Sequence, residues 1–84
     1  MNLEILTPEK KLWSDEVYGV QLPGISGKFE VLDRHAPIVS ALGKGVLKVL
    51  TDKQNTRSFT ISGGFVEVLD NKVTVLAEQA EPVE

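Results

Sequence analysis

Apolar residues recur at every second position in several short stretches of this 84-residue chain. Leu3 and Ile5, for example, alternate with Asn2 and Glu4. A period of two places neighbouring side chains on opposite faces of an extended backbone, so each stretch predicts a half-buried β-strand. Val, Ile, Phe and Thr dominate these stretches, and strands favour these residues. We expect the inward-facing side chains to be largely buried: Leu3, Ile5, Val20, Leu22, Phe29, Val31, Phe59, Ile61, Val73 and Val75.

Turn-forming residues separate the apolar stretches. Asp70-Asn71-Lys72 lies between VEVL and VTVL, and corners rich in glycine or proline occur at Pro23-Gly24 and Gly63-Gly64. Short strands that recur every 8–12 residues or so are typical of sandwiches and barrels. The chain has no segment long enough for a crossover helix, which disfavours a parallel architecture. The sequence therefore predicts an all-β protein, an antiparallel sandwich or flattened barrel with no helix longer than two turns.

The chain is short enough to form a single domain. We expect the β-sandwich to cover residues 1–77 and residues 78–84 to form a short, frayed acidic tail, because AEQAEPVE favours a helical turn that Pro82 then interrupts. The first residues, MNLEIL, do not have the pattern of a signal peptide. No apolar stretch approaches the ~18–20 residues that span a bilayer, so we expect no direct membrane insertion.

Composition disfavours several classes of function. The net charge is −3 and the basic residues alternate with acids, whereas nucleic-acid binding requires clustered Lys and Arg. The chain has no cysteine and one histidine, so neither a zinc site nor a catalytic triad has enough side chains. We therefore expect no catalytic residue, no metal site and no cofactor.

Two glycine-containing corners and one lysine are candidate binding or modification sites. Residues 24–27 and Gly63-Gly64 lack the GK[ST] sequence and the following helix of a phosphate-binding loop, so these glycines are better explained by backbone geometry. Thr51-Asp52-Lys53 resembles the modified hairpin of lipoyl and biotinyl carrier domains. A carrier domain modified at Lys53 is therefore the alternative function.

His35 has two interpretations. A lone histidine beside a proline often fixes a loop by bonding a nearby carbonyl group. Alternatively, His35 contacts another protein, because Ala36-Pro37 forms a small, rigid surface beside it.

Four motifs give the chain a resemblance to a known family: G-x-x-G at residues 24–27, H-A-P at 35–37, S-G-G-F-V-E-V at 62–68 and N-x-V-T-V-L-A at 71–77. Together with LTPEKKLWSDEV at 6–17, they resemble the epsilon subunits of bacterial F-type ATP synthases. The resemblance covers nearly the whole chain in order. It implies a β-sandwich of about ten strands at the foot of the central rotor stalk. Such a subunit has no chemistry of its own and couples the gamma subunit to the c-ring in proton- or sodium-driven ATP synthesis.

The resemblance also implies partners, a location and contact residues. The partners are the gamma subunit and the c-ring, at the cytoplasmic face of the bacterial inner membrane, where the subunit is bound peripherally through the complex. The side facing gamma carries Thr7, His35 with Ala36 and Pro37, and Ser40. The loop facing the c-ring comprises Gly27, Lys28, Phe29, Glu30 and Asp33.

The chain departs from the family pattern at two places. Many relatives have an acid directly after the second glycine, where this chain has Lys28, so Glu30 is expected to supply the acidic contact. Typical relatives also continue into a C-terminal helical hairpin that restrains ATP hydrolysis. The sequence given stops where that hairpin begins, and we expect no autoinhibition from residues 78–84.

Overall fold

The computed structural model describes residues 1–83, and every regular element in that range is a β-strand. This confirms the expectation of an all-β fold without long helices. The ten strands are β1 (Asn2–Leu6), β2 (Lys11–Glu16), β3 (Gly19–Gly24), β4 (Gly27–Leu32), β5 (Ile38–Leu42), β6 (Gly45–Leu50), β7 (Thr56–Ile61), β8 (Gly64–Leu69), β9 (Lys72–Ala77) and β10 (Ala80–Val83).

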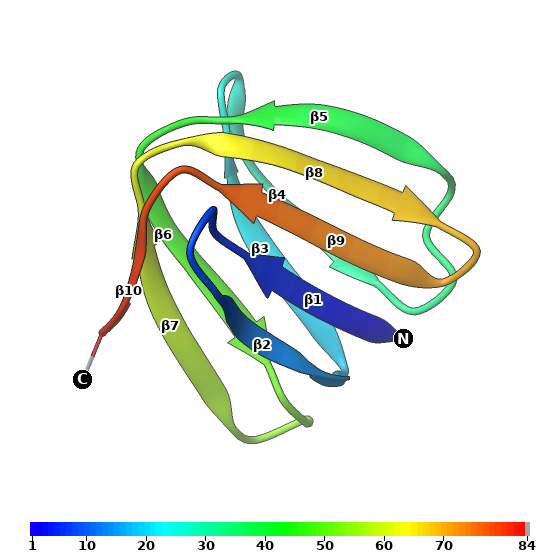
Figure 1. Ribbon diagram of the computed structural model, residues 1–84. Helices are drawn as coiled ribbons and strands as arrows, with labels where there is room; N and C mark the ends of the chain where they lie inside the picture. Colours follow the sequence, from blue (N-terminus) through cyan, green and yellow to red (C-terminus); the bar gives the residue numbers. More distant parts are fainter. Residues whose placement is uncertain (84) are drawn as a thin grey trace.

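The strands form one curled sheet whose two halves face each other, as Figure 1 shows. One half has the strand order β5-β8-β9-β1-β2, and the other contains β10-β7-β6-β3 with β4 on the far side of β3. Strand pairing joins the halves at a single position, Gly24 opposite Leu42. The hydrogen bonds there run from the Ile25 N–H to the Ala41 carbonyl and from the Gly43 N–H to the Pro23 carbonyl. Two packed halves with this limited connection make the predicted flattened β-sandwich.

One pair of strands differs from the antiparallel expectation. β1 runs parallel to β9, with Leu3 beside Val73 and Ile5 beside Val75. The other strand pairs within residues 1–83 are antiparallel. A parallel pair requires only a long connection, and the seven strands between β1 and β9 supply one without a crossover helix.

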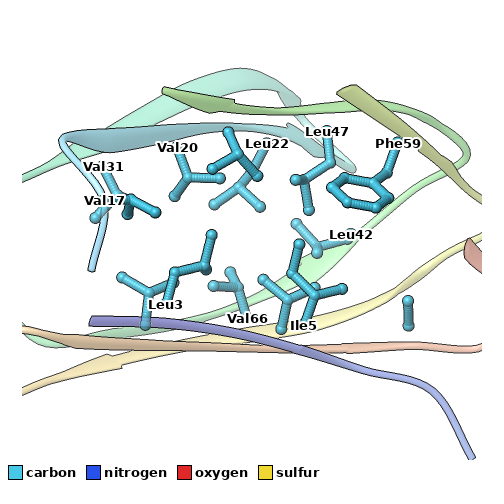
Figure 2. Close-up of a cluster of buried hydrophobic side chains, with 14 of the residues drawn as sticks. Leu3, Ile5, Val17, Val20, Leu22, Val31, Leu42, Leu47, Phe59 and Val66 are labelled. Atoms are coloured by element: carbon cyan, nitrogen blue, oxygen red, sulfur yellow. The ribbon is translucent and has the colours of Figure 1, made fainter. Parts of the chain in front are cut away.

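The core fills the space between the two halves. In Figure 2, Val20, Leu22 and Leu47 point from one layer towards Leu3 and Ile5 of the other. Nine of the ten side chains predicted to be buried are at most 3% exposed. Phe29 is the exception, because it is only half-buried. It lies on β4, which pairs with β3 alone, so no strand covers its other side.

The expected frayed tail is ordered in part. Ala80–Val83 forms β10 and pairs with the edge of β7, where Ala80 lies opposite Ile61 and Pro82 opposite Phe59. Proline is tolerated on an edge strand because such a strand needs only half of its backbone donors. The prediction of a frayed end was wrong for these four residues, because the free edge of β7 offers them hydrogen bonds. Glu84 lies outside the described residues.

Candidate functional site

His35 lies in the connection between β4 and β5, with its ring half-buried. The Nδ1 atom is 2.7 Å from the carbonyl oxygen of Ala36. Because a carbonyl oxygen only accepts, Nδ1 carries the hydrogen, and in the neutral ring Nε2 then has an acceptor lone pair for another molecule. Ala36 and Pro37 are exposed beside the ring. The structure therefore contains the bond to a nearby carbonyl by which a histidine fixes its loop. It also leaves Nε2 available for the alternative interpretation, a contact with another protein.

Asn71 holds the backbone before His35 in place. Arg34 has a left-handed φ of 63°, and its backbone N–H donates to the Asn71 side-chain oxygen at 2.7 Å. The Asn71 amide nitrogen donates to Asp33 at 2.9 Å, and the amino group of Met1 donates to the same carboxylate oxygen at 3.1 Å. These bonds, with that from Asn71 first, lower the pKa of Asp33. The corner is thus fixed by the turn between β8 and β9 and by the start of β1.

Asn71 is available for these bonds because of the turn in which it lies. Asp70 and Asn71 have φ values of 52° and 61°. They join Leu69 to its partner Lys72 through a two-residue hairpin turn, which requires left-handed residues and favours Asp and Asn. The tight turn predicted from the sequence is therefore confirmed.

Thr7 lies at the other end of the sandwich, directly after β1. Its backbone N–H donates to the Lys10 carbonyl at 2.9 Å, and its hydroxyl accepts from the Lys10 N–H at 3.3 Å. Thr7 also lines a mostly apolar groove of about 510 Å³ together with Ile25 and Leu76. The hydroxyl is therefore partly engaged locally, while the side chain borders a surface groove.

Ser40 is half-buried in β5, opposite the buried Val66. It has the same parity as Leu42, so it faces the interior of the sandwich, and its hydroxyl lies 3.4 Å from the Ala41 carbonyl. Its neighbours Val39 and Ala41 face outward. A partner on the outer face of β5 would contact these two residues before Ser40.

The residues expected to face the c-ring lie along β4 and beyond it. Gly27, Lys28 and Glu30 are exposed, and Glu30 accepts a hydrogen bond of 2.9 Å from Gln21. Phe29 is half-buried between them. Gly24 allows the tight turn into β4, because a Cβ there would lie 2.6 Å from the Gly27 carbonyl oxygen.

The structure separates residues that the resemblance groups together. Met1 contacts Asp33, and Thr7 lies six extended residues further along, which corresponds to roughly 20 Å. Thr7 is therefore close to Ile25 in the β3–β4 turn, and far from His35. Asp33 lies beside His35 and about five extended residues, some ~17 Å, from Lys28. A partner that contacts both Thr7 and His35 has to cover the sheet between them.

Titratable groups elsewhere on the described surface are paired or isolated. Glu4 lies 3.2 Å from the Lys11 amine and 3.4 Å from that of Lys72, and these contacts lower its pKa, the hydrogen bond from Lys11 most strongly. Within residues 1–83, no group of three or more His, Cys, Asp or Glu side chains is arranged to hold a metal ion.

Lys53 is exposed in the loop between β6 and β7. Asp52 organises this loop by accepting hydrogen bonds from the backbone N–H groups of Gln54 at 2.8 Å and Asn55 at 2.9 Å. The Asn55 side chain bonds the same carboxylate and, with these backbone bonds, lowers the pKa of Asp52. Exposure is common to surface lysines, so it does not by itself favour modification of Lys53.

Sequence reasoning missed an exposed apolar face. Val39, Phe65, Leu69 and Leu76 on β5, β8 and β9 are all at least half exposed. The signal was present in the sequence. In GFVEVL the residues Phe65 and Leu69 have the opposite parity to the buried Val66 and Val68, so both faces of β8 carry apolar side chains.

The candidate residues occupy corners and one sheet face of a β-sandwich. Comparison with known proteins makes the class specific. The model of the beta-sandwich domain of the ATP synthase delta/epsilon chain matches residues 1–83. This chain belongs to that family.

Relatives and solved structures agree with this family. The ATP synthase epsilon chain of Nitratidesulfovibrio vulgaris is 49% identical over 84 residues, which cover 100% of this chain and 62% of that protein. The epsilon chain of Salinibacter ruber is 47% identical, with 98% of this chain and 60% of that protein covered. The chain thus spans about three fifths of the length of these curated relatives. A chain in the Euglena gracilis mitochondrial ATP synthase superposes with a TM-score of 0.89 at 26% identity, covering 95% of this chain and 51% of that one.

Residues 1–83 contain no helix with the length and apolarity needed to cross a membrane.

Proposed function

We propose that this chain is a non-catalytic subunit of the central rotor stalk of an F-type ATP synthase, where it couples the gamma subunit to the c-ring. The observation that carries the proposal is the family match over residues 1–83. The subunit itself performs no chemistry. It transmits rotation between two partners during ATP synthesis driven by protons or sodium ions. It binds the cytoplasmic face of a bacterial inner membrane peripherally, through the complex.

The fold suits a part that transmits torque. A single apolar cluster joins both halves of the sandwich, and protein interiors of this kind are close-packed and resist deformation. The molecule measures 26 × 26 × 23 Å along its principal axes, so opposite faces are rigidly separated by more than two nanometres. A block of this shape can hold two partners at a fixed spacing.

In this proposal, gamma contacts the corner formed by His35, Ala36 and Pro37, and extends to Thr7 and Ser40. The exposed Ala36 and Pro37 lose little conformational entropy when a partner covers them. The Nε2 atom of His35 bonds a polar group on gamma. The c-ring contacts Gly27, Lys28, Phe29 and Glu30, and Asp33 completes this set from the other end of β4.

The experiment measures gamma binding and thermal unfolding for three variants of one residue. His35→Ala removes the ring and leaves the group on gamma unpaired, at a cost of roughly 1–3 kcal/mol, so affinity falls about ten- to a hundredfold. His35→Asn keeps a donor near the position of Nδ1, which can still bond the Ala36 carbonyl, but it has no atom at the position of Nε2. We expect His35→Asn to keep the melting temperature of the wild type and lose affinity.

His35→Gln is the matched control, because its amide reaches the position of Nε2 and should recover part of the binding. If His35→Ala and His35→Asn bind gamma as the wild type does while the melting temperature falls, His35 serves only to fix the loop. That result would show that the His35 corner does not contact gamma.

A further inference from the structure

The two halves of the sandwich are joined differently on its two sides. On one side the Ile25 N–H donates to the Ala41 carbonyl at 3.3 Å, and the Gly43 N–H donates to the Pro23 carbonyl at 2.8 Å. On the other side the sheet ends, with β2 last in one half and β10 beside β7 in the other, as Figure 1 shows. Within residues 1–83, β2 pairs with β1 alone, so no strand pairing closes this second side. We call it the open side.

Three side chains meet across the open side: Trp13 of β2, and Arg57 and Phe59 of β7. The rings of Trp13 and Phe59 meet edge to face, with their centroids 6.4 Å apart and an interplanar angle of 79°. The guanidinium carbon of Arg57 lies over the same indole, 5.8 Å from its centroid. Both geometries are attractive, the first between the ring quadrupoles and the second between the cation and the ring face. We call these three residues the Trp13 cluster.

Strand register explains why the Trp13 cluster forms. Trp13 lies opposite the buried Ile5 of β1, and Phe59 lies opposite the buried Leu47 of β6. Arg57 precedes Phe59 by two residues, so its side chain leaves the same face of β7, near the start of that strand. Side chains from both halves thus point towards each other at a place where no strand pairing connects β2 to β7.

The burial of these side chains shows what holds the indole in place. Phe59 is 3% exposed, Trp13 is half-buried and Arg57 is exposed. The Trp13 Nε1 atom is buried without a hydrogen-bond partner among the described residues. An unpaired buried donor costs free energy, and this one would regain a hydrogen bond to water if the open side widened. The ring contacts with Phe59 and Arg57 therefore have to outweigh this tendency in order to keep the open side closed.

Hinge motion is the deformation that this arrangement resists least. Two packed layers joined by backbone along one side can rotate about that side, and residues on the opposite side then move farthest. The backbone join at Gly24 and Leu42 lies in the middle of the strand order, and the Trp13 cluster joins strands near its two ends. Because a contact resists rotation best when it lies far from the hinge, the Trp13 cluster is well placed to prevent the two halves from opening.

We propose that the Trp13 cluster holds the two halves at a fixed angle, so that rotation imposed on one half reaches the other without opening the sandwich. This inference deepens the proposed function and rests on it. Of the residues assigned to gamma, Thr7 adjoins β1 and Ser40 lies on β5, in the half that carries Trp13. Those assigned to the c-ring, such as Lys28, lie on β4, in the half that carries Arg57. The load between the two partners therefore passes from one half to the other.

The first test uses the isolated 84-residue chain, in which Trp13 is the only tryptophan. Arg57→Ala removes an exposed side chain, so the melting temperature should stay within a few degrees of the wild type. Loss of an exposed cation–π contact should raise the population of the open state about two- to fivefold, and acrylamide should then quench the indole fluorescence more strongly. Arg57→Lys keeps a charge near the ring and should recover part of the protection. Lys53→Ala is the matched control, because it removes an exposed charge from the neighbouring loop, outside the cluster.

A distance measurement tests the motion itself. The chain has no cysteine, so two introduced cysteines can carry spin labels without a background signal. Ser14 of β2 and Thr60 of β7 are exposed on the two strands that flank the open side. We expect the distances between labels at these positions to extend to larger values in Arg57→Ala and to match the wild type in Lys53→Ala. Unchanged quenching together with unchanged distances in Arg57→Ala would overturn this inference and leave the proposed function standing.

A measurement on the assembled complex links the Trp13 cluster to rotation. In a reconstituted ATP synthase we expect the Arg57→Ala chain to bind gamma as the wild type does, but to support a smaller ion gradient at the same rate of ATP hydrolysis. Arg57→Lys should restore part of that gradient. An undiminished gradient with an Arg57→Ala chain that opens in isolation would overturn the role in transmitting rotation. A wild-type chain that fails to bind gamma would overturn the proposed function and this role with it, whatever the measurements on the isolated chain show.

Discussion

Gly64 is the glycine at which an added side chain would fit least well. Its φ of 151° is rarely adopted by other residues, and a Cβ would overlap the carbonyl oxygen of Leu76 in the neighbouring strand. Gly64→Ala therefore forces β8 and β9 apart, and we expect the free energy of unfolding to fall by roughly 3 kcal/mol or more. Equilibrium unfolding in urea measures the change.

Gly27→Ala is the control for this prediction. Gly27 also has a positive φ, of 129°, but a Cβ there would meet no atom within 4 Å. Only the backbone strain remains, so we expect a loss of about 1–2 kcal/mol. Equal losses for the two variants would show that the contact with Leu76 is not the dominant effect.

Asp33 makes the His35 corner sensitive to acid. Hydrogen bonds from Asn71 and the Met1 amine hold its pKa below the ordinary value, so the folded state binds a proton less readily than the unfolded state. The associated stability is present above the unfolded pKa and is lost as the pH falls through the folded pKa. We expect the corner to loosen only below about pH 4.

Two-dimensional NMR can follow the amides of Asn71 and Arg34 during an acid titration. Asp33→Asn should remove their shared transition and leave that of the separate Asp52 loop intact. A transition that persists in Asp33→Asn would assign the acid response to another group.

Residue-level prediction from the sequence succeeded where burial follows strand parity. Nine of ten core positions were identified in this way. Phe29 has the right parity but lies on an edge strand, and edge positions are decided by pairing between distant segments. The hydrogen bonds of Asn71 could not be predicted from the sequence, because they join it to Asp33 and Arg34, which lie 38 and 37 positions away along the chain.

At the scale of elements, β10 shows how a weak segment becomes ordered by its neighbour. AEPV has little tendency to form a strand, yet it pairs along residues 58–61 of β7, and Ala80 packs against the core. Removing residues 80–84 exposes that edge, and we expect a loss of about 1–2 kcal/mol in the free energy of unfolding, from several backbone bonds and a small apolar contact.

Amide hydrogen exchange checks this prediction, because the N–H groups of β7 that face β10 should lose protection in the shortened chain. The exchange of β8 and β9 on the other half of the sandwich is the internal control. Unchanged exchange throughout β7 would mean that β10 contributes nothing to its order.

Strand pairing also decides which candidate residues come together. Local motifs located the corners correctly, since both the H-A-P sequence and the residue 24–27 turn lie at strand ends. Their positions in space depend on the register of β1 with β9, which no local pattern encodes. The family resemblance implies that Thr7 and His35 share the side facing gamma, and in the fold they lie near opposite ends of β1.

At the scale of the whole molecule, the sandwich is compact and its interior is filled by apolar side chains. The Cα radius of gyration is 11.3 Å, and one apolar cluster occupies the interior. The grooves of about 510 and 260 Å³ lie at the surface of the sandwich. These features agree with the proposed coupling role and leave the carrier hypothesis to be tested directly at Lys53.

A carrier domain presents its lysine on a tight hairpin that a ligase recognises, whereas the loop around Lys53 spans residues 51–55 and is shaped by Asp52. Its backbone bonds from Gln54 and Asn55 give an open polar loop, and the Thr51 N–H closes it on the Asn55 carbonyl at 3.0 Å. We expect intact-mass spectrometry to find Lys53 unmodified after co-expression with lipoate or biotin ligase. A known carrier domain in the same cells controls for ligase activity. A stoichiometric lipoyl or biotinyl addition that Lys53→Arg abolishes would establish the carrier role and displace the coupling role, because a covalent swinging arm has no place in a rigid adaptor.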